Sequence, residues 1–493
     1  MKALFFILLS LPGLCSYAQS AHDNQQPWVR VFYQKTAGQP VWITAEGRHN
    51  LNLLTHFFSG AVYLGLDAND YEPLLLRTLT NNSYIMPAAA DTMDADRRIT
   101  AAAIQFFRDI AYGRLENPPV KYNGLPLLPG GGEDIASRLA ECLLKDQFSR
   151  FLLSVEPVDT GYIAVKNRLA ATYTIIMDTA FKEIPVTSLT ADSSNLPLLR
   201  RLRQVEVTDT VFCSLQDRIR RAQHLFNTLD DGILRSRFLQ ALNVPLLYRL
   251  QELKNALNQL RWLRYYKANG ALVLVNIPST ELTLYMDSKP VLYSRVITGK
   301  KSTPTPTLGS RITEVVLFPY WTVPNKIAVR ELLPHIKRDR QYLVENQFEI
   351  LDRKGHIVDP SQVNWSQLGI GNFPYVIRQN TGCDNSLGIV KLNFYSPFGV
   401  YLHDTPGKNL FMLQQRFFSH GCVRVEEAVL LAHLLLKEQA GAMETLEAKG
   451  SQPDQHPVIF PVPGMAYVLI LYNTAWPDAA GQVRFYENVY NRN

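Results

Sequence analysis

A short stretch near the C-terminal end carries residues that suit covalent acyl chemistry. Ser419, His420, Gly421 and Cys422 follow one another, so a thiol lies one glycine away from an imidazole. Cysteine catalysis needs a thiolate, a proton acceptor and donors for a developing oxyanion. Cys422 is therefore the candidate nucleophile, and His403, upstream of it, is a candidate base.

The residues after Cys422 predict a helix that would activate the thiol. Glu426 and Glu427 would occupy its acidic first turn, and Gly441 would end it. A thiol at a helix N-terminus has a lowered pKa because it feels the positive end of the helix dipole. Gly421 permits a tight turn there, so backbone amides would remain free to form an oxyanion hole.

Two histidines compete for the role of base. His420 is adjacent in sequence, whereas His403 closes the predicted strand "GVYLHDTP". Along that strand Val400 and Leu402 share one face, and Tyr401 and His403 share the other. A neighbouring element would have to bring His403 to the thiol.

Other interpretations of this stretch remain open. A lone cysteine is most often an inert buried side chain. A zinc site made by His403, His420 and Cys422 is a second alternative, but the usual second pair of ligands at fixed spacing is missing. A papain-like site fits poorly, because there the cysteine precedes the histidine in the chain.

Length and composition bound the class of protein. The chain has 493 residues, so two or three domains are expected. Its 46% hydrophobic and 19% charged content is that of a globular protein. The net charge of +6, from 50 basic and 44 acidic residues, is too weak to indicate nucleic-acid binding.

The N-terminus predicts a cleaved secretory signal over residues 1–18. Lys2 supplies the positive start, Ala3 to Leu14 the apolar stretch, and Ser16 to Ala18 a small-x-small cleavage site. A membrane anchor is the alternative, but the apolar run is shorter than the roughly 20 residues that span a bilayer. Cys15 would suit a lipoprotein, except that a leucine precedes it. No later stretch is long and apolar enough to span a membrane. Together with the predicted signal, this leads us to expect an exported, soluble protein.

Export implies an oxidising compartment, where a reduced cysteine needs a reason. Four cysteines follow the predicted signal, which is too few for a disulfide scaffold in a chain of this length: Cys142, Cys213, Cys383 and Cys422.

Hydrophobic periodicity divides the rest of the chain. Residues 19–195 are predicted to be a helical scaffold; one face of its clearest helix carries Ile99, Ala103, Phe106, Phe107 and Ile110. Residues 196–263 predict several short helices. From Ala271 onward the period becomes two, as in strands, so residues 264–493 predict a β-rich domain. Within it, residues 320–378 lack a clean period; they predict a short helix and an irregular loop that pack down as a lid.

"VYLHDTP" followed by "RFFSHGCVRV" resembles the catalytic signature of the L,D-transpeptidases. His403 and Cys422 lie 19 positions apart (422 − 403), within the habit of that family. Further stretches are similar to the larger murein L,D-transpeptidases: "VNIPSTELTLYMD", "FPYWTVPNKIAVRELLP" and "YNTAWPDAAGQVRFYENVY". "LQDRIRRAQHLF" with "ALNVP", within residues 196–263, is similar to a shortened peptidoglycan-binding module.

The resemblance implies a fold and a set of roles. The fold would be α+β, with a helical scaffold, a small helical module and a catalytic domain capped by residues 320–378. Cys422 would be the nucleophile, His403 the base oriented by the backbone at Asp404, and Gly421 part of the oxyanion hole. The pocket would be shaped by Tyr401, Asp404, Ser419, His420 and Arg424. Arg424 would hold a substrate carboxylate; a surface ion pair with Glu426 or Glu427 is an equal alternative.

The resemblance also implies a reaction and a place. An exported, periplasmic enzyme would attack peptidoglycan tetrapeptide stems and form 3→3 crosslinks through a Cys422 thioester, with no metal or cofactor. Carbapenems would acylate the same cysteine. Hydrolysis as an L,D-carboxypeptidase, attachment of a protein to the wall, and an inactive wall-binding protein are the alternatives.

Cys383 raises a separate hypothesis. The resemblance places its loop, "NTGCDNSLG", near the site, where an oxidised pair with Cys422 would inactivate the enzyme. A free thiol, or a partner elsewhere, is the favoured alternative.

Overall fold

The computed structural model describes residues 27–80, 89–114, 121–122, 131–187, 189, 195–205, 214–382, 384–450 and 455–492. The predicted signal segment, Cys213 and Cys383 lie outside these ranges. No helix within them is long and apolar enough to cross a membrane.

The N-terminal part is helical, as the sequence predicts. Its helices are α1 (Pro27–Lys35), α2 (Arg48–Ser59), α3 (Pro73–Thr80), α4 (Ala89–Tyr112), α5 (Gly132–Leu144), α6 (Phe151–Val155) and α7 (Thr160–Met177). Short 3-10 turns connect them: η2 (Ala61–Leu64), η3 (Ala68–Asp70) and η4 (Phe148–Arg150). The predicted apolar face of α4 is buried along its length, and the helix ends at Tyr112, directly before Gly113, whose φ of +75° suits glycine.

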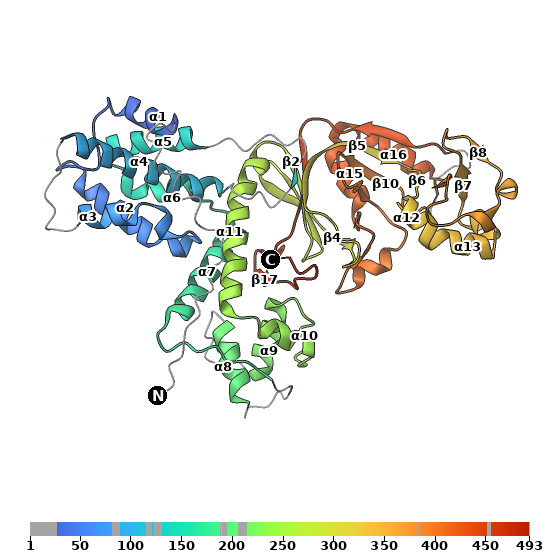
Figure 1. The fold of residues 1–493 in the computed structure, drawn as a ribbon, viewed down its shortest axis with the longest axis horizontal. Coiled ribbons are helices and arrows are strands. Elements are labelled where there is room, and N and C mark those ends of the chain that lie inside the picture. The colour runs from blue at the N-terminus through green and yellow to red at the C-terminus, as the bar shows by residue number, and fades with distance from the viewer. Residues whose placement is uncertain are drawn as a thin grey trace.

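Four helices follow, α8 (Leu196–Val205), α9 (Leu215–Leu225), α10 (Ser236–Leu242) and α11 (Leu246–Ala268). The long α11 continues beyond the predicted domain boundary at residue 263. It stands between the helical part and the β-rich part (Figure 1) and contacts α4 and α7 as well as β2 and β16, described below. Because it is covered from several sides, its buried residues do not form a single stripe.

The C-terminal part is built on a sheet that closes on itself. Eight strands form the ring, in the order β5 (Leu308–Leu317), β10 (Val390–Phe394), β11 (Leu402–His403), β13 (Val423–Val425), β4 (Lys289–Gly299), β3 (Glu281–Met286), β2 (Ala271–Asn276) and β15 (Ala466–Leu471). β15 pairs back to β5 and closes it. Three more strands add to its edges: β1 (Lys121–Tyr122), β12 (Phe417–Ser419) and β14 (Val458–Pro461).

Alternate residues of these strands point inward and form one core. Leu392, Leu402, Val423 and Val425 belong to that core and are fully buried. Because successive side chains of a strand point to opposite faces, the sequence neighbours of these residues lie on the outer face of the ring. A hairpin of β16 (Ala475–Pro477) and β17 (Val483–Phe485) packs against the helices.

The capping segment is more regular than its sequence predicts. Its four-stranded sheet has the order β6 (Trp321–Thr322), β9 (Val376–Gln379), β7 (Phe348–Leu351) and β8 (Ile357–Val358). Its helices are α12 (Asn325–Ile327), the π-helix η5 (Ala328–Leu332), α13 (Leu333–Arg338), α14 (Gln341–Glu345), η6 (Pro360–Gln362) and η7 (Trp365–Gln367). The segment has its own hydrophobic core, which includes Ile336, Ile350 and Trp365. Strands of two to four residues are too short to show a period in the sequence.

The predicted helix directly after Cys422 is wrong. Residues Val423–Val425 form β13, which pairs with β11 and β4, and the next helix, α15, spans Ala428–Leu436. Gly441 does not end it either, because it lies inside α16 (Ala440–Lys449), which follows the turn η9 (Lys437–Gln439). The alternation of valine with arginine in this stretch fits a strand, and pairing on both sides overrides the helical pattern that follows.

Candidate active site

Strand pairing brings the sequence-predicted residues to one place on the outer face of the ring. β11 and β13 run parallel, with Leu402 opposite Val423 and His403 opposite Arg424. The same register puts Tyr401 beside Cys422, and the Val423 amide donates to the Tyr401 carbonyl at 3.1 Å. Strand spacing and rise put the Cα atoms of His403 and Cys422 roughly 8 Å apart, on the same face.

The Cys422 thiol points toward the segment before β11. Its Sγ atom lies 3.9 Å from the carbonyl oxygen of Gly399. Burial raises the pKa of the Cys422 thiol, whereas hydrogen bonds from the Tyr401 backbone and hydroxyl and the charges of Lys391 and Arg424 lower that pKa. Burial is the largest of these effects, so the pKa is raised, opposite to the lowering predicted from a helix dipole. The predicted dipole is missing, since β13 and not a helix follows the cysteine.

His403 is buried and held by its own backbone neighbour. Its Nδ1 lies 2.6 Å from the carbonyl oxygen of Asp404, so Nδ1 carries the proton and Nε2 is left as the acceptor. Burial, together with the charges of Arg424 and Lys391, lowers the pKa of His403 to about 3, against the opposing effect of the hydrogen bond to Asp404. The imidazole is therefore neutral and has a free acceptor nitrogen, as a general base requires.

The side chain of Asp404 points away from the thiol. Its Oδ2 accepts a hydrogen bond from the Ile389 amide at 3.1 Å, and its Oδ1 pairs with the Lys408 ammonium at 2.7 Å. The Asp404 amide donates to Val390 at 2.8 Å. These contacts fix the backbone that carries His403.

Ser419 and Gly421 shape the turn that presents the thiol. The buried Ser419 hydroxyl donates to the Cys422 carbonyl at 2.6 Å and accepts from the Gly421 amide at 3.1 Å. Gly421 has a φ of +119°, which disfavours other residues. Thr305 donates to the Gly421 carbonyl at 2.9 Å. The Gly421 amide predicted for the oxyanion hole is thus engaged by Ser419 in this structure.

His420 contacts the capping segment. Its Nε2 lies 2.8 Å from Glu331 Oε1 on η5 and 3.4 Å from the Lys300 ammonium. On the opposite side of the thiol, the Tyr401 hydroxyl interacts with the side chain of Trp321 from β6. Cap residues therefore contact both His420 and Tyr401, which flank Cys422.

Arg424 does not form the predicted ion pair. Glu426 forms a bidentate pair with Arg295 instead, with distances of 2.5 and 2.7 Å. Within the described ranges Arg424 has no salt bridge, and its buried Nε lacks a hydrogen-bond partner. The surface-pair alternative is therefore not realised here.

Sequence reasoning missed Lys391, Trp321 and Glu331. Lys391 alternates with buried Val390 and Leu392 in β10, so the sequence places it on the polar face. The sequence does not show which residue lies opposite Lys391, because the partner strand β11 consists only of Leu402 and His403 and is too short to recognise. Trp321 and Glu331 belong to the capping segment, whose sequence shows no clear helical or strand periodicity.

A metal site receives no support from the described residues. They contain no cluster of three or more His, Cys, Asp or Glu side chains able to hold an ion. Cys383 lies outside the described ranges, so its pairing with Cys422 stays a hypothesis. Cys142 and Cys422 are free.

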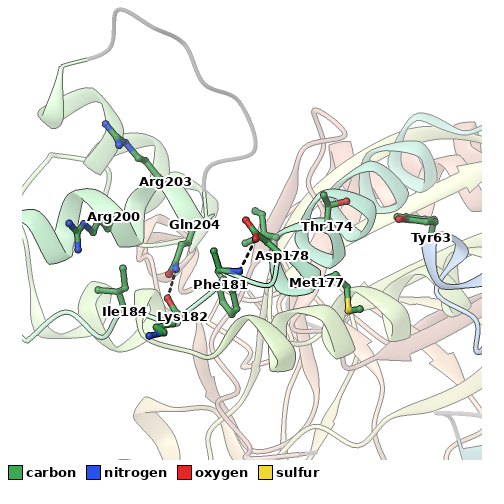
Figure 2. A pocket seen from close by; sticks show the side chains of 12 residues that line it. Tyr63, Thr174, Met177, Asp178, Phe181, Lys182, Ile184, Arg200, Arg203 and Gln204 are labelled. Atoms are coloured by element: carbon green, nitrogen blue, oxygen red, sulfur yellow. Dashed lines mark hydrogen bonds between the residues drawn. The ribbon is translucent and has the colours of Figure 1, made fainter.

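A large groove, of about 900 Å³, lies on the helical part, away from this centre (Figure 2). It is formed by η2, the end of α7, the segment that follows, and α8. Figure 2 shows the Gln204 amide donating to the Lys182 carbonyl and the Phe181 amide donating to Asp178. None of its lining residues belongs to the group around Cys422.

Two parts of the chain match known protein families. Residues 270–442 match the family described as the L,D-transpeptidase catalytic domain, and residues 27–169 match the Scaffold domain. A putative L,D-transpeptidase of Haemophilus influenzae is 40% identical over 204 residues, which are 41% of this chain and 41% of that protein.

Solved structures with similarity include the L,D-transpeptidase from Mycobacterium smegmatis, at 14% identity and a TM-score of 0.19. The matched region is 41% of this chain and 58% of the chain in that structure. The L,D-transpeptidase LdtMt1 in complex with imipenem has 12% identity and a TM-score of 0.17, with 41% of this chain covering 59% of it.

The catalytic-domain match includes Cys422, His403 and every strand of the ring except β15, and the Scaffold match includes α1 to α6 and the first half of α7. Residues 270–442 are therefore similar to L,D-transpeptidase catalytic domains, and residues 27–169 are similar to Scaffold domains.

Proposed function

We propose that this protein is an exported, periplasmic L,D-transpeptidase that forms 3→3 crosslinks between peptidoglycan stems. The observation that carries the proposal is the placement of Cys422, His403 and Tyr401 on one face, within the residues that match the catalytic-domain family. Export rests on the N-terminal sequence pattern and on the location of the proposed substrate in the cell envelope.

The proposed reaction begins from a neutral Cys422 thiol and a neutral His403 imidazole, between which a proton moves. Nε2 of His403 accepts the thiol proton as Sγ of Cys422 attacks the carbonyl carbon of the third stem residue. The C–N bond to the terminal D-amino acid breaks, the proton passes to the leaving amine, and a thioester remains. The Tyr401 backbone and hydroxyl, which hydrogen bond the sulfur, stabilise the thiolate as it forms.

The second half-reaction consumes the thioester. A side-chain amine of another stem gives a proton to His403 and attacks the thioester carbonyl, which forms an amide bond and releases the thiol. No external energy source is required, because the bond broken and the bond formed are both amides. Attack by water instead of the amine gives L,D-carboxypeptidase activity at the same centre.

The test uses purified protein and tetrapeptide muropeptides, with products read by mass spectrometry. We expect crosslinked dimers from the natural protein and none from Cys422→Ala. Cys142→Ala is the matched control, because Cys142 is also a free, half-buried thiol but lies on α5. Tripeptides alone would identify a carboxypeptidase, and unchanged substrate would identify a binding protein.

Imipenem offers a second test of the nucleophile. Its strained β-lactam carbonyl should acylate the sulfur and add one drug mass to the intact protein. The adduct should form with Cys142→Ala and be absent from Cys422→Ala. Acylation at any other residue would contradict the assigned nucleophile.

A further inference from the structure

Three charged or titratable side chains form a row across the outer face. Lys391 on β10 stands opposite His403 on β11, and His403 stands opposite Arg424 on β13. Because directly paired residues share a face, the imidazole has a cation on each side. The thiol of Cys422 lies on the same face, two residues before Arg424.

Lys391 is turned toward the reactive centre. Its ammonium lies 4.3 Å from the centroid of the Tyr401 ring, and Tyr401 in turn interacts with Cys422. Among the described residues no salt bridge neutralises Lys391. Glu314, a neighbouring acid, accepts a hydrogen bond from Asn393 at 2.6 Å.

Arg424 is unneutralised as well. In the described part of the chain its buried Nε has no hydrogen-bond partner, and Glu426, two residues later, pairs with Arg295 instead. Burial lowers the pKa of both Lys391 and Arg424, which shows that the two cations are partly desolvated. Two desolvated cations without counter-ions are costly unless an anion joins them.

We propose that Lys391 and Arg424 form a cationic clamp that binds a carboxylate of the acyl donor beside Cys422. This inference rests on the proposed function, because a stem peptide is the donor. Two carboxylates on such a donor lie within one residue of the attacked carbonyl: the terminal α-carboxylate, and a side-chain carboxylate on the attacked residue. Their chemistry is shared, and the test separates them.

The clamp gives the two cations a role in catalysis as well as binding. Their charges disfavour a protonated His403 in the free protein. A bound carboxylate neutralises them, so the imidazole becomes a stronger base only when the donor is in place. Donors that lack the carboxylate would lose both affinity and rate.

The first experiment needs no peptidoglycan. Iodoacetate and iodoacetamide alkylate a thiolate in the same way, since the S–C bond forms as iodide leaves, but only iodoacetate is an anion. We expect Lys391→Met and Arg424→Met each to lower the iodoacetate-to-iodoacetamide rate ratio at Cys422 by about threefold, and the double variant by about tenfold. Lys289→Met, at the exposed start of β4, is the control and should keep the ratio of the natural protein. Unfolding temperatures check that each variant is folded.

The second experiment compares tetrapeptide donors by the rate of acyl-enzyme formation. One donor is amidated at its terminal carboxylate and the other at the side-chain carboxylate of the third residue. We expect one amidated donor to acylate Cys422 about tenfold more slowly than the unmodified donor. The carboxylate that is amidated in that donor is then the one that the clamp binds. In the double variant that difference should disappear.

Equal alkylation ratios in all folded variants would overturn the clamp, as would equal rates for all three donors. A ratio that falls as expected, in a protein that no tetrapeptide acylates, would support the clamp and overturn the proposed function instead.

Discussion

At the reactive centre, thiol and imidazole are both neutral in the resting protein. Burial raises the pKa of the Cys422 thiol, and burial together with the charges of Arg424 and Lys391 lowers that of His403 to about 3. A cysteine protease of the thiolate–imidazolium type relies on the opposite shifts. Here the thiolate forms only as the proton moves to Nε2, so this centre depends on substrate binding for its reactivity.

The lowered pKa of His403 predicts a pH-dependent stability. Between about pH 6.5 and pH 3 the unfolded chain binds a proton on this residue that the folded chain does not. Stability is therefore fully present above pH 6.5 and falls with decreasing pH, by about 2 kcal/mol from pH 7 to pH 5. His403→Gln should lack this part of the decrease when urea unfolding is measured at both pH values.

His49→Gln is the control, since His49 is exposed on α2 and should leave the decrease intact. If His403→Gln shows the same decrease as the natural protein, His403 is not held neutral by the fold.

At the scale of elements, the Ser419 hydroxyl connects two backbone groups of the turn between β12 and β13. Ser419 satisfies the Cys422 carbonyl and the Gly421 amide together. Ser419→Ala should lower the free energy of unfolding by about 2 kcal/mol, because the buried Gly421 amide and the partly buried Cys422 carbonyl both lose their hydrogen-bond partner. The decrease would be measured by urea unfolding, together with the rate of imipenem acylation, which should also fall.

Ser59→Ala, at the exposed end of α2, is the matched change and should cost much less. Retained stability in Ser419→Ala would mean that water replaces the hydroxyl.

The π-helix η5 holds the cap to the reactive stretch through one side-chain contact. Glu331→Gln removes the charge that faces His420 at 2.8 Å. Because both groups are partly exposed, we expect a modest effect: faster amide exchange in η5 and a KM for the donor raised about two- to fivefold. Glu345→Gln, exposed on α14 of the same cap, should change neither quantity.

At the scale of the whole molecule, α11 is joined to the closed sheet by a buried polar network. The Asn473 side chain donates to the side chain of Gln259 in α11 at 2.7 Å. The backbone amide of Asn473 donates to the side chain of Asn276 in β2 at 2.9 Å. The Asn276 side chain donates back to the Asn473 carbonyl at 3.1 Å. The helical part and the catalytic domain are therefore expected to unfold together.

Asn473→Ala should weaken that connection. It leaves buried polar atoms of Gln259 without a partner, which should cost about 1–3 kcal/mol. Scanning calorimetry should then show the single transition broaden or divide into two. Asn269→Ala, at the exposed end of α11, should preserve one sharp transition. A single unchanged transition in Asn473→Ala would show that apolar packing alone couples the two parts.

The sequence by itself determined the residue types of the centre and the faces on which they lie. Period two in "VYLH" placed Tyr401 and His403 together, and period 3.6 identified the buried face of α4, because both patterns are local consequences of backbone geometry. It also determined the succession of a helical part and a β-rich part.

Only the tertiary structure decided what surrounds the thiol. The strand after Cys422, Lys391 beside His403, and Glu331 against His420 all depend on pairing between segments far apart in the chain. A three-residue strand carries too little periodicity to be recognised, and register between distant strands is fixed by the packing of the whole sheet.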